Sequence, residues 1–370
     1  MIIRGSSMPR AMACHGSVSM EQSVPPAPDT DDSKYGTAAH ELSEMVLKGT
    51  VGTSAEMIDR QMTNGVVVTG DMAEASTVYT DHVRSRGLPL YVEHTGSIDI
   101  GSGVIVEGTT DCGAFDEVNG ILYVDDAKFG WRIVEAPTNW QLIVYAMMLM
   151  QMFARVNPNG YMNIRQIVMT IIQPHPEHMD GKIRSVTVDR AQFSDYVGQL
   201  ADFAHELTTK VPMCQTNDKC RDCAALHSCP TAQKAGMNAV DVSGQAVIDT
   251  LTVDALSSEL TTLIRAKDMI NNRLAALTDL TRDHIKHGRA VPHWGIEESY
   301  GHTKWNEGIN AEMLELLGGS NCTELKMVTP AAAKRNGVSE ETVKSLTTRP
   351  FIGHKLVPQD TDALAQKVLD

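Results

Sequence analysis

The sequence predicts an α/β protein with a mainly helical C-terminal extension. Two observations predict the α/β part: strand-like alternation over residues 90–128, and apolar helical runs before and after it. A heptad-like leucine stripe after residue 250 predicts the extension. The chain of 370 residues is long enough for more than one domain, and its 42% hydrophobic content excludes wholesale disorder. We expect one domain over residues 1–235 and the extension over 236–370.

The first part of the chain is expected to be irregular and then helical. Residues 1–35 carry a Pro-rich stretch at 24–28 and show no clear period. A helix is expected from about 37 to 48, because Gly49 follows it as a stop signal. A second helix is expected over 70–86.

Strands dominate the next segment. Residues 90–107 alternate and are rich in β-branched side chains. A hairpin is expected from 108–115 and 121–128, because Asn119-Gly120 is a strong turn signal. The elements expected after this hairpin are a long apolar helix at 138–155, a buried strand at 163–173 and a helix at 189–209.

The extension is expected to begin with one long helix at about 250–287. The apolar residues of its stripe are Leu256, Leu260, Leu263, Ile270, Leu274 and Leu277. Packing on the rest of the protein, or an αα-hairpin, is favoured over a free coiled coil because the stripe covers only about three heptads. Small α/β elements are expected beyond it: a hairpin-like piece around Trp294 and Trp305, and short helices near 309–317 and 329–346.

Charge and targeting patterns narrow the class further. The net charge of −14 argues against nucleic acid as a partner, although bound divalent metal ions would invert the sign locally. No apolar run is long enough for a membrane span, and no signal-peptide pattern precedes the domain. We therefore expect a cytoplasmic protein without membrane partners.

The hairpin carries the residues that point to chemistry. Alternation places Asp126 and Lys128 on one face of their strand and Asp125 on the other, with Asp111 near Asp126 on the neighbouring strand. Burying such groups is costly, so they suit a Mg²⁺ site in which the lysine stabilises developing charge. The alternative from the residues alone is an exposed strand whose charges face solvent.

Three further residues bear on this choice. Gln141 and Tyr145 stand four apart on the expected long helix and therefore share a face. His40 lies on the first expected helix, where a lone histidine is more often an ordinary surface or core residue than a ligand.

The cysteines indicate a second metal site. An odd count of seven, without a signal peptide, argues against a disulfide framework. Cys220, Cys223 and Cys229 have the spacing C-x₂-C-x₅-C, which is typical of metal ligands and suits zinc or an iron–sulfur cluster. The fourth ligand is open between the local Cys214 and the remote Cys14.

Together, the order His, Gly-x-x-Asp, Asp-x-Lys and Gln-x-x-x-Tyr resembles the RecB-like branch of the PD-(D/E)XK nuclease superfamily. The resemblance implies a restriction-endonuclease-like core, in which helices flank a mixed central sheet. It implies a divalent-metal-dependent deoxyribonuclease that uses Mg²⁺ or Mn²⁺. The implied metal ligands are His40, Asp111, Asp126 and the carbonyl of Ala127, the implied catalytic lysine is Lys128, and Gln141 and Tyr145 form an accessory motif that contacts DNA.

The cysteine order adds to this resemblance. RecB-like nucleases that include AddB and CRISPR-adaptation nucleases hold a [4Fe–4S] cluster, with one cysteine before the nuclease core and a C-x₂-C-x₅-C triplet after it. The resemblance therefore implies a cluster on Cys14, Cys220, Cys223 and Cys229, with Cys214 in reserve and zinc as the alternative. Such a cluster would close a loop of roughly 200 residues and clasp the domain.

The chain is also similar to a phage family of such nucleases in Cys14-x-Gly-Ser, Gly36-Thr-Ala-Ala-His-Glu-Leu and Asp126-Ala-Lys-Phe-Gly. This similarity implies an exonuclease of phage recombination or replication, working in the host cytoplasm with DNA and a single-strand annealing protein. Oligomeric state stays open. Trp131-Arg132 stands where more basic residues are expected. The alternative function is a DNA-end or partner-binding module on a nuclease fold that no longer cuts.

Overall fold

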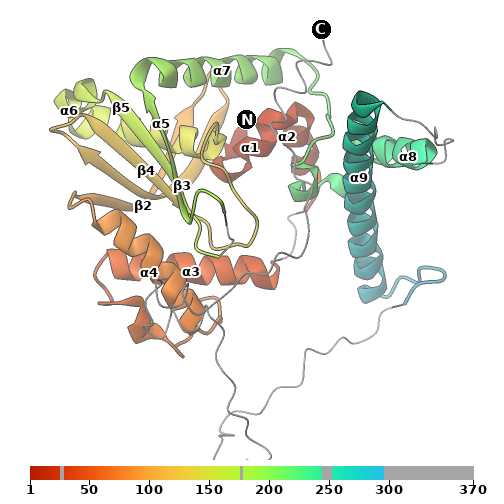
Figure 1. The fold of residues 1–370 in the computed structure, drawn as a ribbon, viewed down its shortest axis with the longest axis horizontal. Helices are drawn as coiled ribbons and strands as arrows, with labels where there is room; N and C mark the ends of the chain where they lie inside the picture. Colours follow the sequence, from red (N-terminus) through yellow and green to blue (C-terminus); the bar gives the residue numbers. More distant parts are fainter. Residues whose placement is uncertain (26–28, 176–177, 244–251, 296–370) are drawn as a thin grey trace, which may run out of the picture. The chain divides into compact units, whose positions relative to one another are not determined.

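A six-stranded mixed sheet forms the centre of the fold (Figure 1). The computed structural model describes residues 1–25, 29–175, 178–243 and 252–295. The strand order is β1-β3-β4-β5-β6, and β2 also pairs with β3. The strands are β1 (Ile2–Arg4), β2 (Leu90–Asp99), β3 (Ile105–Asp116), β4 (Ile121–Ala127), β5 (Gln166–Ile172) and β6 (Ile183–Asp189).

Helices cover both faces of this sheet. Helices α5 and α7 share one hydrophobic cluster with the sheet, and α3 and α4 share a second cluster on the other face. The α-helices are α1 (Met8–Ala13), α2 (His15–Gln22), α3 (Asp31–Leu47), α4 (Gly70–Arg84), α5 (Trp140–Val156), α6 (Pro158–Asn163), α7 (Arg190–Thr209), α8 (Pro230–Ser243) and α9 (Val253–Lys286). Single 3₁₀ turns occur at η1 (Gly5–Ser7), η2 (Ser54–Met57), η3 (Cys220–Asp222) and η4 (Leu226–Ser228). The expectation of an α/β protein with a mixed sheet flanked by helices is confirmed.

The strand boundaries differ from the expected ones at one turn. Strands β2 and β3 form an antiparallel hairpin, and β3 runs without a break through Gly108. The reversal lies at residues 101–103, where Gly101, Ser102 and Gly103 all have positive φ. Gly108 serves a different purpose, because a Cβ atom there would lie 2.8 Å from Cε1 of Tyr145.

The expectation of irregular structure over residues 1–35 is wrong. Its described residues, 1–25 and 29–35, form β1, α1, α2 and the start of α3. The first three elements are too short to show a period, and tertiary contacts stabilise them: β1 pairs in parallel with β3, and Met8 and Ala11 are buried in the core. Helix α3 begins six residues earlier than expected, at Asp31, because Thr30 caps it by accepting a hydrogen bond from Ser33 N at 3.1 Å.

Helix α5 is the apolar helix expected at 138–155. Asn139 caps its first turn by accepting hydrogen bonds from the backbone N–H groups of Gln141 and Leu142 at 3.1 and 3.4 Å. Most of the helix is buried, so the cap and the packing together fix where Gln141 and Tyr145 point.

The long helix expected at about 250–287 is present as α9, which contacts α8. The large apolar residues of its stripe are mostly exposed among the described residues. Strand β6 and helix α8 were not expected. The elements predicted around Trp305, at 309–317 and at 329–346 lie outside the described residues, and a domain boundary at 235 stays a prediction. In the described part of the chain, no helix has the length and apolarity needed to span a membrane.

Candidate metal site

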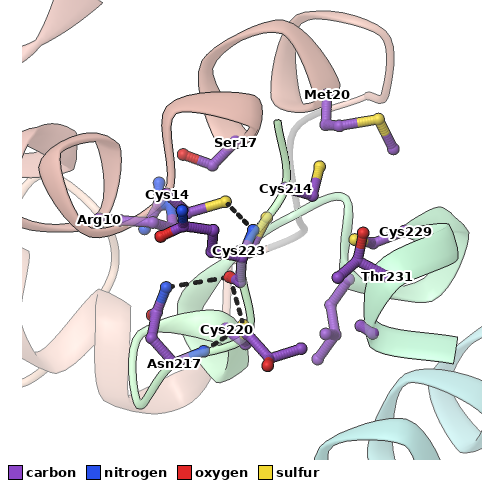
Figure 2. Close-up of a pocket in the computed structure, with 14 residues that line it drawn as sticks. Arg10, Cys14, Ser17, Met20, Cys214, Asn217, Cys220, Cys223, Cys229 and Thr231 are labelled. Carbon is purple, nitrogen blue, oxygen red and sulfur yellow. Dashed lines mark hydrogen bonds between the residues drawn. The ribbon is translucent and has the colours of Figure 1, made fainter. Parts of the chain in front are cut away.

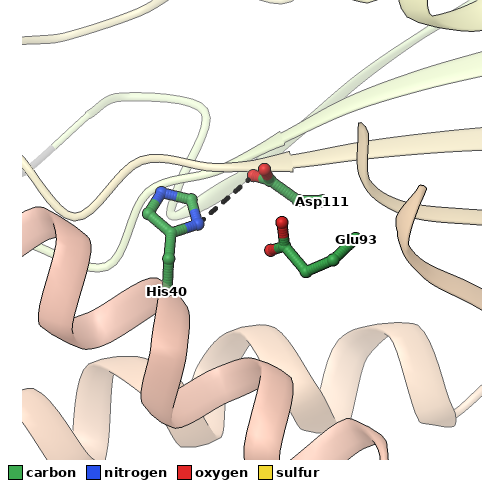
Figure 3. A group of neighbouring side chains, drawn as sticks. All are labelled: His40, Glu93 and Asp111. Carbon is green, nitrogen blue, oxygen red and sulfur yellow. Dashed lines mark ion pairs between the residues drawn. The ribbon is translucent and has the colours of Figure 1, made fainter. Parts of the chain in front are cut away.

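Three side chains from three elements converge beside the sheet: His40 of α3, Glu93 of β2 and Asp111 of β3 (Figure 3). One ligand atom from each lies within 4.8 Å of the other two. Nδ1 of His40 is 3.6 Å from Oδ2 of Asp111. One imidazole nitrogen and two carboxylates are a donor set that fits a divalent metal ion.

Glu93 reaches this position through an unusual backbone conformation. It is the only non-glycine residue of β2 with a positive φ, at 53°. In a regular strand Val92 and Ile98, six residues apart, would point to the same face of the sheet. Instead Val92 packs on the cluster under α3 and α4, and Ile98 packs on the cluster under α5. The side-chain alternation of β2 therefore changes phase between them, and Glu93 supplies the irregular residue. Strain of this kind concentrates at functional sites.

A chain of polar contacts continues from the triad onto β4 and α5. Nζ of Lys128 lies 2.7 Å from Oδ2 of Asp126 and donates to Oε1 of Gln141 at 3.1 Å. Nε2 of Gln141 donates to Oδ1 of Asp126 at 2.9 Å and to the Tyr145 hydroxyl at 3.2 Å. Asp126 is buried, and its Oδ2 has the ion pair but no hydrogen bond of regular geometry.

The opposite face of β4 holds a separate, structural ion pair. Asp125 is fully buried and meets the guanidinium of Arg86, with Nη2 donating to Oδ1 at 2.7 Å. Asp125 and Asp126 thus point to opposite faces, as alternation predicts. Because both oxygens of Asp125 contact Arg86, this carboxylate is not free to join the site.

Burial and mutual repulsion make the carboxylates of the site weak acids. Burial first and then the charge of Asp111 raise the pKa of Glu93 to about 8. Burial likewise raises the pKa values of Asp111 and Asp126 to about 6, against the opposing effect of Lys128. Burial and Lys128 lower the pKa of His40 to about 4, so its imidazole is neutral at pH 7 and suited to bind a metal ion.

These charges fit a bound cation. Burial acts to lower the pKa of Lys128, but Asp126 and Asp111 raise it overall, whereas Lys48 is the ammonium group whose charge acts on Glu93. When Glu93, Asp111 and Asp126 are all ionised, the group carries more negative than positive charge in a buried place, which is unfavourable without a further cation. A divalent ion would balance it.

The predicted residues fall into two connected groups. His40 and Asp111 belong to the triad, and Asp126, Lys128, Gln141 and Tyr145 form the neighbouring polar chain. Ala127 links them, because its N–H donates to Oδ2 of Asp111 at 2.7 Å. Whether the Ala127 carbonyl and Asp126 bind metal stays a prediction.

Glu93 is the site residue that the sequence reasoning missed. The turn Gly101-Ser102-Gly103 was a usable signal. A hairpin centred on Ser102 places Glu93 directly opposite Asp111, between the observed pairs Val92↔Cys112 and His94↔Thr110.

The cysteines line a cavity of their own (Figure 2). Its walls include Cys14, Cys214, Cys220, Cys223 and Cys229. The N–H of Gln215 donates to Sγ of Cys14, and the N–H of Asn217 to Sγ of Cys220, each at 3.3 Å. Within the described residues, no three of these sulfurs lie within 4.8 Å of one another, so the structure does not show a preformed cluster site.

Comparisons with known proteins place the chain in a family. No curated protein matches the sequence. A solved structure, a phage-related exonuclease from Haemophilus somnus 129PT, aligns with 14% identity over 56% of this chain and 93% of that one. Its TM-score of 0.22 is too low to support an inference about this chain. Residues 2–362 match the family described as protein of unknown function (DUF2800), and the chain therefore belongs to the DUF2800 family.

Proposed function

We propose that the protein is a divalent-metal-dependent deoxyribonuclease that hydrolyses phosphodiester bonds. One observation carries the proposal: a metal-competent triad lies next to a half-buried lysine that is paired with a further carboxylate. A Mg²⁺ or Mn²⁺ ion held by His40, Glu93 and Asp111 would polarise the scissile phosphate and lower the pKa of a water. The sequence resemblance to RecB-like PD-(D/E)XK nucleases supports the same activity.

The residues beside the triad have separate proposed roles in the reaction. The ammonium of Lys128 is held by Asp126 and Gln141, so it is positioned to stabilise charge that develops on the phosphate oxygens. Asp126 keeps that ammonium protonated and joins the metal ligands in our proposal. Gln141 orients both Asp126 and the hydroxyl of Tyr145, which would position the substrate.

The sharpest test is Lys128→Ala, assayed on DNA labelled at either the 5′ or the 3′ end, single- and double-stranded. We expect cleavage by the wild-type protein with Mg²⁺ or Mn²⁺, none with a chelator, and a loss of about 100-fold or more in the variant. Lys210→Ala, which removes an exposed lysine from the end of α7, is the matched control. Full activity of Lys128→Ala, with a circular dichroism spectrum unchanged, would refute the assigned site.

The same assay tests the finer parts of the proposal. We propose an exonuclease of phage recombination or replication, for which end-labelled substrates give the polarity directly. A single-strand annealing protein is its proposed partner, by the family resemblance. A protein that binds labelled DNA but does not cut it with either metal would instead be the non-cleaving module.

We further propose that Cys14, Cys220, Cys223 and Cys229 hold a [4Fe–4S] cluster. The shared cavity and the N–H donors to two of the sulfurs support this assignment. A single zinc ion with Zn–S bonds of about 2.3 Å would bring its sulfurs to about 3.8 Å of one another, closer than any three of them lie here.

Anaerobic purification tests the cluster. A brown protein with equimolar iron and sulfide supports the cluster. If metal analysis instead finds zinc, the cysteines hold zinc and not an iron–sulfur cluster. Cys14→Ser should lose the iron and Cys214→Ser should keep it. The reverse result would make Cys214 the fourth ligand.

A further inference from the structure

A groove of mixed polar and apolar lining opens beside Tyr145. It has a volume of about 750 Å³. Its walls come from the N-terminal strand β1 with η1 and from the β2–β3 hairpin, and they include Arg4, Thr95, Ser97, Glu107, Thr109 and Tyr145. No function assigned so far uses this groove.

Tyr145 joins the groove to the site. Its hydroxyl accepts a hydrogen bond from Gln141, which in turn binds Asp126. Its ring fits against two glycines: a Cβ atom on Gly5 or Gly108 would lie 2.5 or 2.8 Å from Cε1. Larger residues at either position would displace the ring. The close packing therefore fixes one aromatic side chain as the boundary between groove and site.

The hairpin extends the same connection along the sheet. Thr109 stands two residues before Asp111 on β3, about 7 Å away along the strand. The hydroxyls of Thr109 and Thr95 lie 3.0 Å apart across the hairpin. Ser97 pairs with Glu107 one step further out. The lining of the groove thus ends, on β3, two residues before Asp111 of the metal site, and it includes Arg4 on β1.

We infer that this groove binds the DNA strand next to the scissile phosphate. This inference rests on the proposed nuclease function. Small-molecule sites are lined mainly by apolar side chains, whereas this groove offers hydroxyls, glycine backbone and one guanidinium, together with the ring of Tyr145 and one carboxylate, Glu107. Hydroxyls, backbone N–H groups and arginine are the groups that contact phosphate and sugar without reading sequence. The volume suits a short stretch of nucleotides.

Arg4 and Glu107 set the strength of this contact. They are register partners on β1 and β3, yet they form no ion pair within the described part of the chain. Arg4 is exposed and available to a phosphate. Glu107 is exposed too and repels that phosphate while attracting Arg4. Substitutions at the two positions should therefore change binding in opposite directions.

The experiment measures binding of a fluorescein-labelled oligothymidylate to the full chain, with Ca²⁺ in place of Mg²⁺. Arg4→Ala should weaken binding about fivefold at 0.1 M salt and lower the slope of log K against log salt by about 0.7. Glu107→Gln should tighten binding by about twofold or more. In the Arg4→Ala background, Glu107→Gln should tighten binding less than it does in the wild type. The reason is that the Glu107 carboxylate no longer has an Arg4 guanidinium for which to compete with phosphate.

Matched controls make the result specific. Arg155→Ala removes an exposed arginine ten residues beyond Tyr145 on α5, and Asp195→Asn removes an exposed carboxylate on α7. Both should bind like the wild type. If Arg4→Ala and Glu107→Gln behave like these controls, or if the wild type binds no oligothymidylate, the groove is not the strand site.

A separate cleavage assay with Mg²⁺ or Mn²⁺ keeps this inference distinct from the proposed function. Cleavage with binding that does not depend on Arg4 refutes the groove and leaves the nuclease standing. Arg4-dependent binding without cleavage refutes the nuclease and leaves the groove as the strand site of a DNA-binding module that does not cut.

Discussion

At the scale of single residues, Glu93 shows how an unfavourable conformation and an unfavourable charge coincide at one position. Its φ of 53° strains the backbone, and its burial raises its pKa to about 8. Both unfavourable features accompany the placement of the Glu93 carboxylate beside His40 and Asp111. A residue that destabilises the metal-free protein in two ways is expected where function, not stability, determines the side chain.

Glu93→Gln should therefore stabilise the metal-free protein at alkaline pH. Between the ordinary pKa of 4.5 and the folded value of about 8, the folded wild type holds a proton that the unfolded chain has lost. Its stability thus falls as pH rises through this window. The shift corresponds to at most about 4 kcal/mol at pH 8, and solvent screening of the partly exposed Glu93 reduces this. The variant should therefore gain about 2 kcal/mol at pH 8 and little below pH 4, measured by urea unfolding with a chelator present.

Asp195→Asn is the control for this series, since it removes an exposed carboxylate and should change stability little at any pH. A Glu93→Gln variant less stable than the wild type at pH 8 would contradict the argument. It would mean that Glu93 is ionised in the metal-free protein and makes favourable contacts there.

At the scale of elements, the sequence predicted those features that depend on neighbours along the chain. Alternation gave the faces of Asp125 and Asp126, Asn119-Gly120 gave the β3–β4 turn, and the four-residue spacing gave a shared face for Gln141 and Tyr145. The phase change at Glu93 could not be predicted this way. A residue with positive φ breaks the period on which the method depends, and the turn centred on Ser102 had first to be recognised.

The convergence of α3, β2 and β3 also predicts how metal binding depends on pH. At pH 7 Glu93, with a pKa of about 8, is mostly protonated, while Asp111 and Asp126, with pKa values of about 6, are mostly ionised. Mn²⁺ must displace the proton of Glu93 to bind its carboxylate. Titration calorimetry in two buffers of different ionisation enthalpy should detect release of about one proton at pH 7, falling toward zero above pH 9.

Two variants identify the side chain that releases this proton when Mn²⁺ binds. Glu93→Gln should bind Mn²⁺ more weakly and release far less than one proton. His40→Ala should also weaken binding but should still release the proton, because His40 is already neutral at pH 7. Equal proton release by the wild type and Glu93→Gln would move the titrating group to another carboxylate.

At the scale of the whole molecule, the sequence predicted the α/β class and most central elements but not how the chain's start is used. Residues 1–25 have little period of their own, and their structure depends on partners about 100 residues away on β3 and about 200 residues away after α7. The N–H of Gly16 donates to the carbonyl of Met213 at 3.0 Å, and Asn217 Nδ2 donates to the carbonyl of Ala13 at 3.1 Å. Contacts at that separation leave no local pattern to detect, and only the family resemblance paired Cys14 with the later cysteines.

This long-range contact makes the proposed cluster a stabilising cross-link with a measurable signature. A link from Cys14 to Cys220–Cys229 closes a loop of roughly 200 residues, for which loop-closure entropy contributes at most about 5 kcal/mol. We expect Cys14→Ser to lower the thermal midpoint of the anaerobic protein by at least about 5 °C. After the cluster has been removed by a chelator and oxidant, Cys14→Ser and the wild type should unfold at similar temperatures.

Cys112→Ser separates the cross-link from ordinary packing. Cys112 is buried on β3 under α3 and α4, away from the cysteine-lined cavity, so its replacement should lower the midpoint equally with and without the cluster. If Cys14→Ser shows the same equal loss, then Cys14 stabilises the protein by packing alone. The clasp would in that case be made by the hydrogen bonds around Ala13 and Gly16, without a metal–sulfur link.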